Sequence, residues 1–147
     1  FVMFVLLFFL AFFPVSTIQV DIGDQSYLLK DERFIISWIH SVEKEEWKEA
    51  YIVQEDSFLL SETAFKTFGA GSPYNEGNTY IQDGFVVMEI GETIPEINMM
   101  ISKNVQTTLI IEDKPIFLYQ LIDEEYESAH FYHQKIPLWK FLKGESL

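Results

Sequence analysis

The sequence predicts an all-β domain, either an antiparallel β-sandwich or a partly open barrel, preceded by a hydrophobic helix. Three observations predict this class. Short segments alternate apolar and polar residues, turn-forming residues (Gly, Pro, Asn, Asp) separate the segments, and no helical period occurs before the end of the chain. Strands with one apolar face need a second layer to cover that face, which is why a sandwich or a barrel is expected.

The first fifteen residues, FVMFVLLFFLAFFPV, form the longest apolar run, and the first charged residue is Asp21. The length of this run lies between that of a signal-peptide core and that of a membrane-spanning helix. No convincing small-x-small cleavage site follows, which favours an uncleaved anchor. We therefore expect residues 1–15 to be a membrane anchor or signal segment that is truncated at its start. Residues 16–147 would form a single extracytoplasmic domain, at the cell surface or in the periplasm.

Nine segments after the anchor have the alternating pattern of strands, and the pattern changes only near the end. There the stretch IPLWKFLK, residues 136–143, predicts a short helix that packs on the domain or rests on a membrane or a partner. The chain has no cysteine, so an exported domain would be held together by packing alone. The expected strands are residues 16–22, 26–30, 33–41, 46–54, 57–65, 85–90, 97–102, 107–113 and 115–123.

The charge of the chain excludes one class of partner. It has 23 acidic and 10 basic side chains, giving a formal net charge of −13. Binding to a phosphate backbone requires lysine and arginine to neutralise the partner, so nucleic acid is not an expected partner. The acidic runs are interpreted as solvated turns and edges, with binding of a cation or a basic partner as the alternative.

The stretch FIISWIHSVEKEEWKEAYIV, residues 34–53, places a histidine and a glutamate on the apolar side of a predicted hairpin. Side chains alternate between the two faces of a strand, so the position of the turn decides which residues pair. A tight turn centred on residues 44–45 places His40 opposite Glu49. A second tight turn places Glu49 opposite Glu62. The register therefore predicts a row of three polar side chains within an apolar face.

Two carboxylates that face each other on a sheet repel, and burying them without a partner is costly. A proton, an imidazolium, a lysine or a metal ion would have to share the site. One histidine and two carboxylates suit a divalent cation such as zinc or manganese, so His40, Glu49 and Glu62 are a candidate metal site. The alternative, which we favour, is a protonated or salt-bridged cluster that fixes the strand register.

No catalytic residue is assigned from the sequence. Ser41 directly follows His40, so on a strand their side chains point to opposite faces and the imidazole cannot activate the hydroxyl group. A metal-assisted hydrolase is disfavoured because no additional base, nucleophile or oxyanion donor is identifiable. His130 and His133 would share a face on a helix and could bind a metal, but a surface segment is the favoured interpretation.

The glycine-rich loop FGAGSPYNEG, residues 68–77, lacks the lysine and the following helix of a phosphate-binding P-loop. Pro73 favours a turn, and we expect positive backbone dihedral angles at Gly69, Gly71 or Gly77. The alternative is a loop that covers a ligand.

The ordered elements FIISWIHSVE, EWKEAYIV and LLSETAFKTFGAGSP resemble domain of unknown function family 1850, whose members are small bacterial proteins. The resemblance is strongest over residues 34–73. Members have an N-terminal hydrophobic segment, and their genes often accompany TRAP transporters of the TAXI type. The resemblance implies an extracytoplasmic accessory role beside the transporter permease or its solute receptor, and it supplies no established activity. The resemblance also implies a set of candidate ligand-binding residues, which join Glu49. They are His40, Ser41, Glu43, Glu62, Gly69, Gly71 and Pro73.

Overall fold

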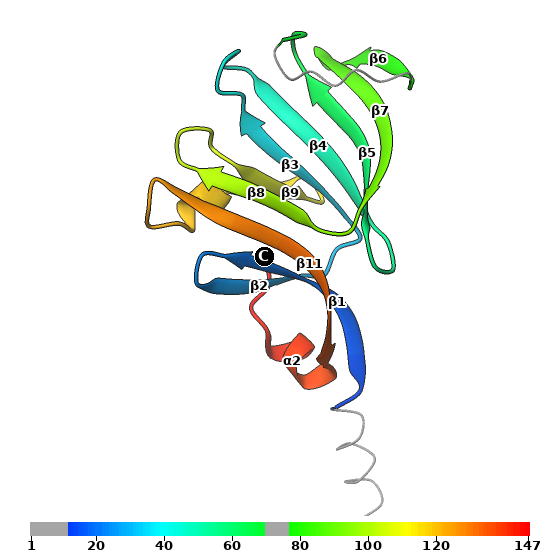
Figure 1. Cartoon of the computed structure of the whole chain (residues 1–147), viewed down its shortest axis with the longest axis vertical. Helices are drawn as coiled ribbons and strands as arrows, with labels where there is room; N and C mark the ends of the chain where they lie inside the picture. The colour runs from blue at the N-terminus through cyan, green and yellow to red at the C-terminus, as the bar shows by residue number, and fades with distance from the viewer. Residues whose placement is uncertain (1–11, 70–76) are drawn as a thin grey trace, which may run out of the picture.

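The computed structural model describes residues 12–69 and 77–147, which form an open sandwich of two antiparallel sheets (Figure 1). The predicted all-β class is confirmed, and the two sheets are not closed into a barrel. The smaller sheet contains, in spatial order, β2 (Gln25–Leu29), β1 (Pro14–Ile22), β11 (Tyr126–Pro137) and β8 (Ile97–Ser102). The larger sheet contains, in spatial order, β10 (Lys114–Ile116), β9 (Thr108–Ile111), β3 (Arg33–Ile39), β4 (Glu46–Val53), β5 (Phe58–Phe65), β7 (Phe85–Ile94) and β6 (Thr79–Gln82).

Strict alternation explains why the two sheets stack face to face. In β1, the side chains of Ile18, Val20 and Ile22 are buried in the core. The intervening Gln19 and Asp21 face away from it, where the Gln19 amide donates a hydrogen bond to Asp21 Oδ1 at 2.8 Å. Burial of the apolar face of each sheet is the main stabilising contribution in such a fold.

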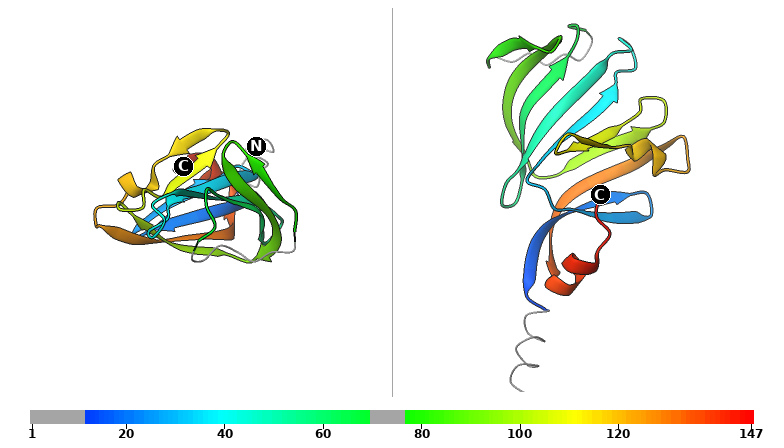
Figure 2. Two further views of the ribbon diagram at one scale, coloured as in Figure 1. Left: turned by 90° about the horizontal axis from the view of Figure 1, so that it is seen from above. Right: turned by 180° about the vertical axis from the view of Figure 1, so that it is seen from behind.

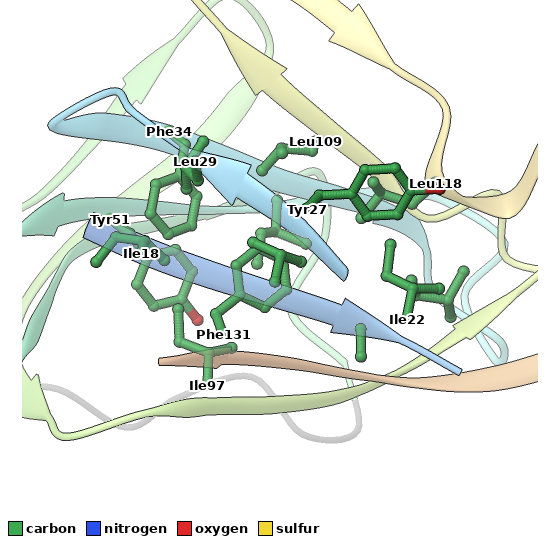
Figure 3. Packing of buried hydrophobic residues seen from close by; sticks show 14 of the residues in the cluster. Ile18, Ile22, Tyr27, Leu29, Phe34, Tyr51, Ile97, Leu109, Leu118 and Phe131 are labelled. Atoms are coloured by element: carbon green, nitrogen blue, oxygen red, sulfur yellow. The ribbon is translucent and has the colours of Figure 1, made fainter. Parts of the chain in front are cut away.

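The centre of the core is a group of aromatic rings contributed by both sheets (Figure 3). Phe34 of β3 stacks on Tyr51 of β4 at a centroid distance of 5.3 Å and on Phe131 of β11 at 5.8 Å. The ring of Phe58 meets Phe34 edge-on at 6.1 Å. Phe34 therefore joins three strands of the larger sheet to β11, one of the two inner strands of the smaller sheet.

A two-residue turn joins β6 and β7, and its two residue types explain its conformation. Asp83 and Gly84 both have positive φ, 52° and 79°. Two successive residues with positive φ are typical of the turn that matches the twist of a hairpin, and Asp-Gly is a favoured pair there. This hairpin lies at the opposite end of the molecule from the C-terminal helix (Figure 2).

The expectations for the last third of the chain are partly wrong. The short helix is confirmed as α2 (Leu138–Lys143). Residues 115–123 do not form one strand, because β10 ends at Ile116 and the 3-10 helix η1 (Leu118–Gln120) follows. The longest strand, β11, was not expected, and the interpretation of its histidines changes. His130 and His133 are three residues apart on a strand, so they point to opposite faces and cannot share a metal as they would on a helix.

The N-terminal helix expected over residues 1–15 lies almost wholly outside the described residues. Of residues 1–15, Pro14 and Val15 belong to β1 and pair with β11. Within residues 12–69 and 77–147, no helix is long and apolar enough to cross a membrane.

Candidate functional site

The predicted row of His40, Glu49 and Glu62 is not formed, because the hairpin between β3 and β4 has a different register. Glu49 lies opposite Ile36, four residues along β3 from its predicted partner. The chain turns earlier than expected: the His40 N–H donates to the Glu45 carbonyl oxygen at 2.8 Å, and the Lys44 N–H donates to the His40 carbonyl oxygen at 2.9 Å. His40 therefore starts a turn instead of continuing a strand.

An irregularity between β4 and β5 removes Glu62 from the row as well. The pairing shifts at Ala50/Tyr51, so Thr63 lies opposite Glu49. Such a bulge inserts an extra residue and exchanges the faces of the side chains beyond it. Glu62 consequently lies on the outer face of the sheet, where the Tyr80 hydroxyl donates to its Oε1 at 2.9 Å.

The three candidate metal ligands thus have three separate surroundings. Among the residues that the structure describes, no group of three or more His, Asp or Glu side chains is arranged to hold a metal ion. The structure therefore does not bring His40, Glu49 and Glu62 together as a metal site.

Other residues from the predicted set do meet, in the turn that follows β3. The Nδ1 atom of His40 pairs with the Glu43 carboxylate. Gly69, in the loop that follows β5, packs directly against the same carboxylate, so closely that a Cβ atom at this position would overlap it. Gly69 does not have the expected positive φ. Its missing side chain, rather than its dihedral freedom, is what this position requires.

The remaining members of the predicted set are less informative. Ser41 lies in the same turn with an exposed side chain. Gly71 and Pro73 lie outside the described residues, so the structure says nothing of them.

A small aromatic cluster fixes this turn to the sheet. The His40 ring stacks on Trp47 with centroids 4.6 Å apart and an interplanar angle of 22°. Trp47 also stacks on Phe65 of β5 at 5.1 Å and lies 6.3 Å from Trp38. With Met88 of β7, Trp47 and Phe65 form a second buried core, separate from the main one. The His40–Glu43 turn is therefore attached to a packed surface.

A cavity of about 290 Å³ lies beside this cluster, where the edge strand β8 meets the inner face of β3 and β4. Glu49 contributes its carboxyl group to the wall, and the Tyr51 hydroxyl donates to Glu49 Oε2 at 2.5 Å. Trp38 connects the cavity to the aromatic cluster, since its ring takes part in both. The cavity is lined by Ile36, Trp38, Glu49, Tyr51, Ile97, Asn98, Met99, Met100, Val105 and Thr107.

Burial controls the chemistry of this carboxyl group. It raises the pKa of Glu49 above its ordinary value, and the hydrogen bond from Tyr51 offsets part of the rise. Burial also raises the pKa of Tyr51, and the charge of Glu49 adds to this rise. The tyrosine therefore remains a hydrogen-bond donor. The arrangement can accept a hydrogen bond or an ion pair from a ligand, or donate a hydrogen bond when Glu49 is protonated.

Sequence reasoning identified Glu49 but missed the opposite wall of the cavity. Parity correctly placed this glutamate on the apolar face of β4. The wall formed by Asn98, Met99 and Met100 comes from β8, which pairs with β11 and belongs to the other sheet. No local pattern in the sequence indicates that β8 lies against β3 and β4.

The fold and the cavity together define a class: an open, all-β sandwich with a carboxyl-bearing cavity between its sheets. The family model described as "Domain of unknown function (DUF1850)" matches residues 34–118, and the chain belongs to this family. The matched range includes the His40–Glu43 turn, Glu49 and β8. No curated protein and no solved structure was found to match the chain.

Replacing Glu49 by glutamine is expected to remove one loss of stability that accompanies rising pH. The folded pKa of Glu49 exceeds its unfolded value. The carboxyl group therefore contributes stability that is fully present below the unfolded pKa and is lost as pH rises through the folded pKa. Glutamine stays neutral and keeps an oxygen that can accept the Tyr51 hydrogen bond. At pH 7 the variant should be more stable by about 1 kcal/mol.

Urea unfolding of the whole chain in detergent, at several pH values from 4 to 8, measures this effect. Glu62→Gln is the matched control, because the same change on the outer face should leave the wild-type pH dependence in place. A Glu49→Gln variant with an unchanged pH dependence would show that burial of Glu49 does not cause it.

Proposed function

We propose that this chain is a membrane-anchored extracytoplasmic binding protein that takes a small ligand into the Glu49 cavity. The observation that carries the proposal is a half-buried carboxyl group with a raised pKa in the wall of a mainly apolar cavity of about 290 Å³. Cavities with apolar walls and few polar groups are the usual form of small-molecule sites, and perturbed pKa values are concentrated at such sites.

The lining residues define the chemical class of the ligand. Ile36 and Met99 offer apolar surface, which suits an apolar ligand body. Trp38 offers an aromatic ring, and Glu49 offers a carboxylate. An ammonium group benefits from both the ring and the carboxylate, whereas an anionic ligand would be repelled by Glu49. The proposed ligand is a small organic cation with an apolar body.

The proposed partner is a TRAP transporter of the TAXI type, through its permease or its solute receptor. The resemblance of the HSVE and FGAGSP elements to the family supports this partner, because it implies that genes of the family often accompany such transporters. A domain held beside a permease could bind a solute at the membrane surface. Co-purification of the chain with a co-expressed permease of this type tests the association, and separation of the two in mild detergent would contradict it.

Thermal unfolding of the whole chain in detergent tests the ligand class. The probes are cyclohexylamine, cyclohexanecarboxylate and, after chelator treatment, zinc, manganese or calcium. A compound that binds only the native state must raise the unfolding midpoint in a concentration-dependent way. We expect cyclohexylamine to raise the midpoint of the wild type and of Glu62→Gln, and to leave Glu49→Gln unchanged.

The other probes separate the alternatives. An equal effect of cyclohexylamine on all three proteins would indicate binding outside the cavity, and no effect would overturn the organic cation as ligand. Stabilisation by a metal ion that Glu49→Gln abolishes would replace the organic cation with a divalent cation. A larger effect of cyclohexanecarboxylate would reverse the assigned charge of the ligand.

A further inference from the structure

The outer face of α2 carries large apolar side chains that are exposed. Leu138 and Phe141 are partly buried against the domain. Trp139 and Leu142 occupy the next positions at the same i, i+3 spacing, which places them together on another face. They are 40% and 69% exposed. The helix therefore presents large apolar side chains to its surroundings.

The start of the described chain adds to this surface. The Leu138 N–H donates to the Phe13 carbonyl oxygen at 2.9 Å, which joins the residue before β1 to the helix. Phe12 and Phe13 are 54% and 64% exposed. The start of β1 and α2 lie at the same end of the molecule, away from the β6–β7 hairpin (Figures 1 and 2). We call Phe12, Phe13, Trp139 and Leu142 the apolar end.

Positive charge accompanies the apolar end on a chain that is otherwise strongly acidic. Lys140 and Lys143 are exposed on α2, which has no acidic residue. A cavity of about 350 Å³ between α2 and the smaller sheet is lined in part by both lysines, Trp139 and Gln134. Glu145 also lines this cavity, so the two lysines outnumber the one acidic residue there. Lysines beside the exposed ring of Trp139 match the phosphate and glycerol layer of an anionic bilayer.

We propose that the apolar end lies on an anionic phospholipid bilayer, with Trp139 and Leu142 in the interface and Lys140 and Lys143 on lipid phosphates. The inference rests on the membrane attachment in the proposed function. A bilayer is the occupant because the eleven residues that precede Phe12 in the sequence are all apolar. Lysine beside tryptophan and leucine on a short helix is the composition of an interfacial segment. The bilayer contact would orient the domain relative to the membrane.

The whole chain is incorporated into nanodiscs of phosphatidylcholine, alone or mixed with phosphatidylglycerol, with or without brominated acyl chains that quench tryptophan. The difference in emission between wild type and Trp139→Phe reports Trp139 alone. We expect bromination to reduce this difference by at least about twofold in the mixed discs, because tryptophan locates at the level where acyl chains begin.

Charge reversal tests the lysines. Lys140→Glu/Lys143→Glu should weaken the quenching of Trp139 in the mixed discs. Lys66→Glu/Lys114→Glu makes the same change in net charge just after β5 and in β10 of the larger sheet, and it should leave the quenching unchanged. Equal quenching in the two disc types, or equal behaviour of the two charge variants, would overturn the anionic lipid as partner.

Two further outcomes separate this inference from the attachment on which it rests. A chain that co-elutes with the discs but shows no quenching of Trp139 is attached without docking, which overturns the inference alone. A chain that does not co-elute with the discs overturns both the attachment and the docking. Neither outcome bears on ligand binding at Glu49, which is measured in detergent.

Discussion

Replacing Phe34 by alanine is expected to lower the free energy of unfolding by about 3–5 kcal/mol. Phe34 is 2% exposed, and its ring contacts Tyr51, Phe58 and Phe131. The loss has two parts: the transfer free energy of the removed ring and the cavity left behind. Collapse of that cavity is opposed because the strands around it are held by ladder hydrogen bonds on both sides of the core.

Denaturant unfolding of the whole chain, followed by tryptophan fluorescence, measures this loss. Phe117→Ala is the matched control, because Phe117 is 42% exposed and the same atoms are removed from a partly solvated position. Its cost should stay within about 1 kcal/mol. Similar losses in the two variants would mean that the rings around Phe34 do not form the central core of the sandwich.

Trp47→Ala is expected to cost about 3–5 kcal/mol as well, and Trp47→Phe much less. The Trp47 side chain is 6% exposed and lies between the rings of His40 and Phe65. Its buried Nε1–H has no hydrogen-bond partner among the described residues. Phenylalanine keeps an aromatic ring in the cluster and removes this unsatisfied donor, so part of the lost packing is offset.

The same unfolding experiment compares these variants with Trp139→Ala. That control removes the same atoms from a side chain that is 40% exposed. In detergent it should change stability by no more than about 1 kcal/mol. A loss for Trp47→Phe that equals the loss for Trp47→Ala would show that the indole itself, and not its apolar surface, holds the turn after β3.

Local alternation was enough to predict most of the fold. The eight expected segments from residue 16 to residue 113 all overlap strands. The strands β6 and β11 were not among the expected segments, and for β11 there is a physical reason. Its apolar Ala129 and Phe131 are followed by His133 on the same face, and its start is acidic and exposed. What holds β11 is pairing with β1 and β8, which lie far away in the sequence.

Of the candidate site, the sequence predicted Glu49 but not the residues that surround it. Parity reports which face a side chain occupies, and it placed Glu49 correctly on the apolar face. Register depends on turns, and the turn after β3 contains Lys44 with a φ of 57°, a conformation that lysine seldom adopts and that no local pattern announced. The bulge at Ala50/Tyr51 also has no signal in the sequence, and it moves Glu62 to the other face of the sheet.

The contact between Glu43 and Gly69 also constrains how this sequence can change. A side chain at position 69 would occupy the space of the Glu43 carboxylate, so it could be accommodated only if Glu43 moved or became smaller. Moving Glu43 would in turn release its pairing with His40. Substitutions at positions 43 and 69 are therefore not independent of each other. Positions 43 and 69, although far apart along the chain, should therefore change together in evolution.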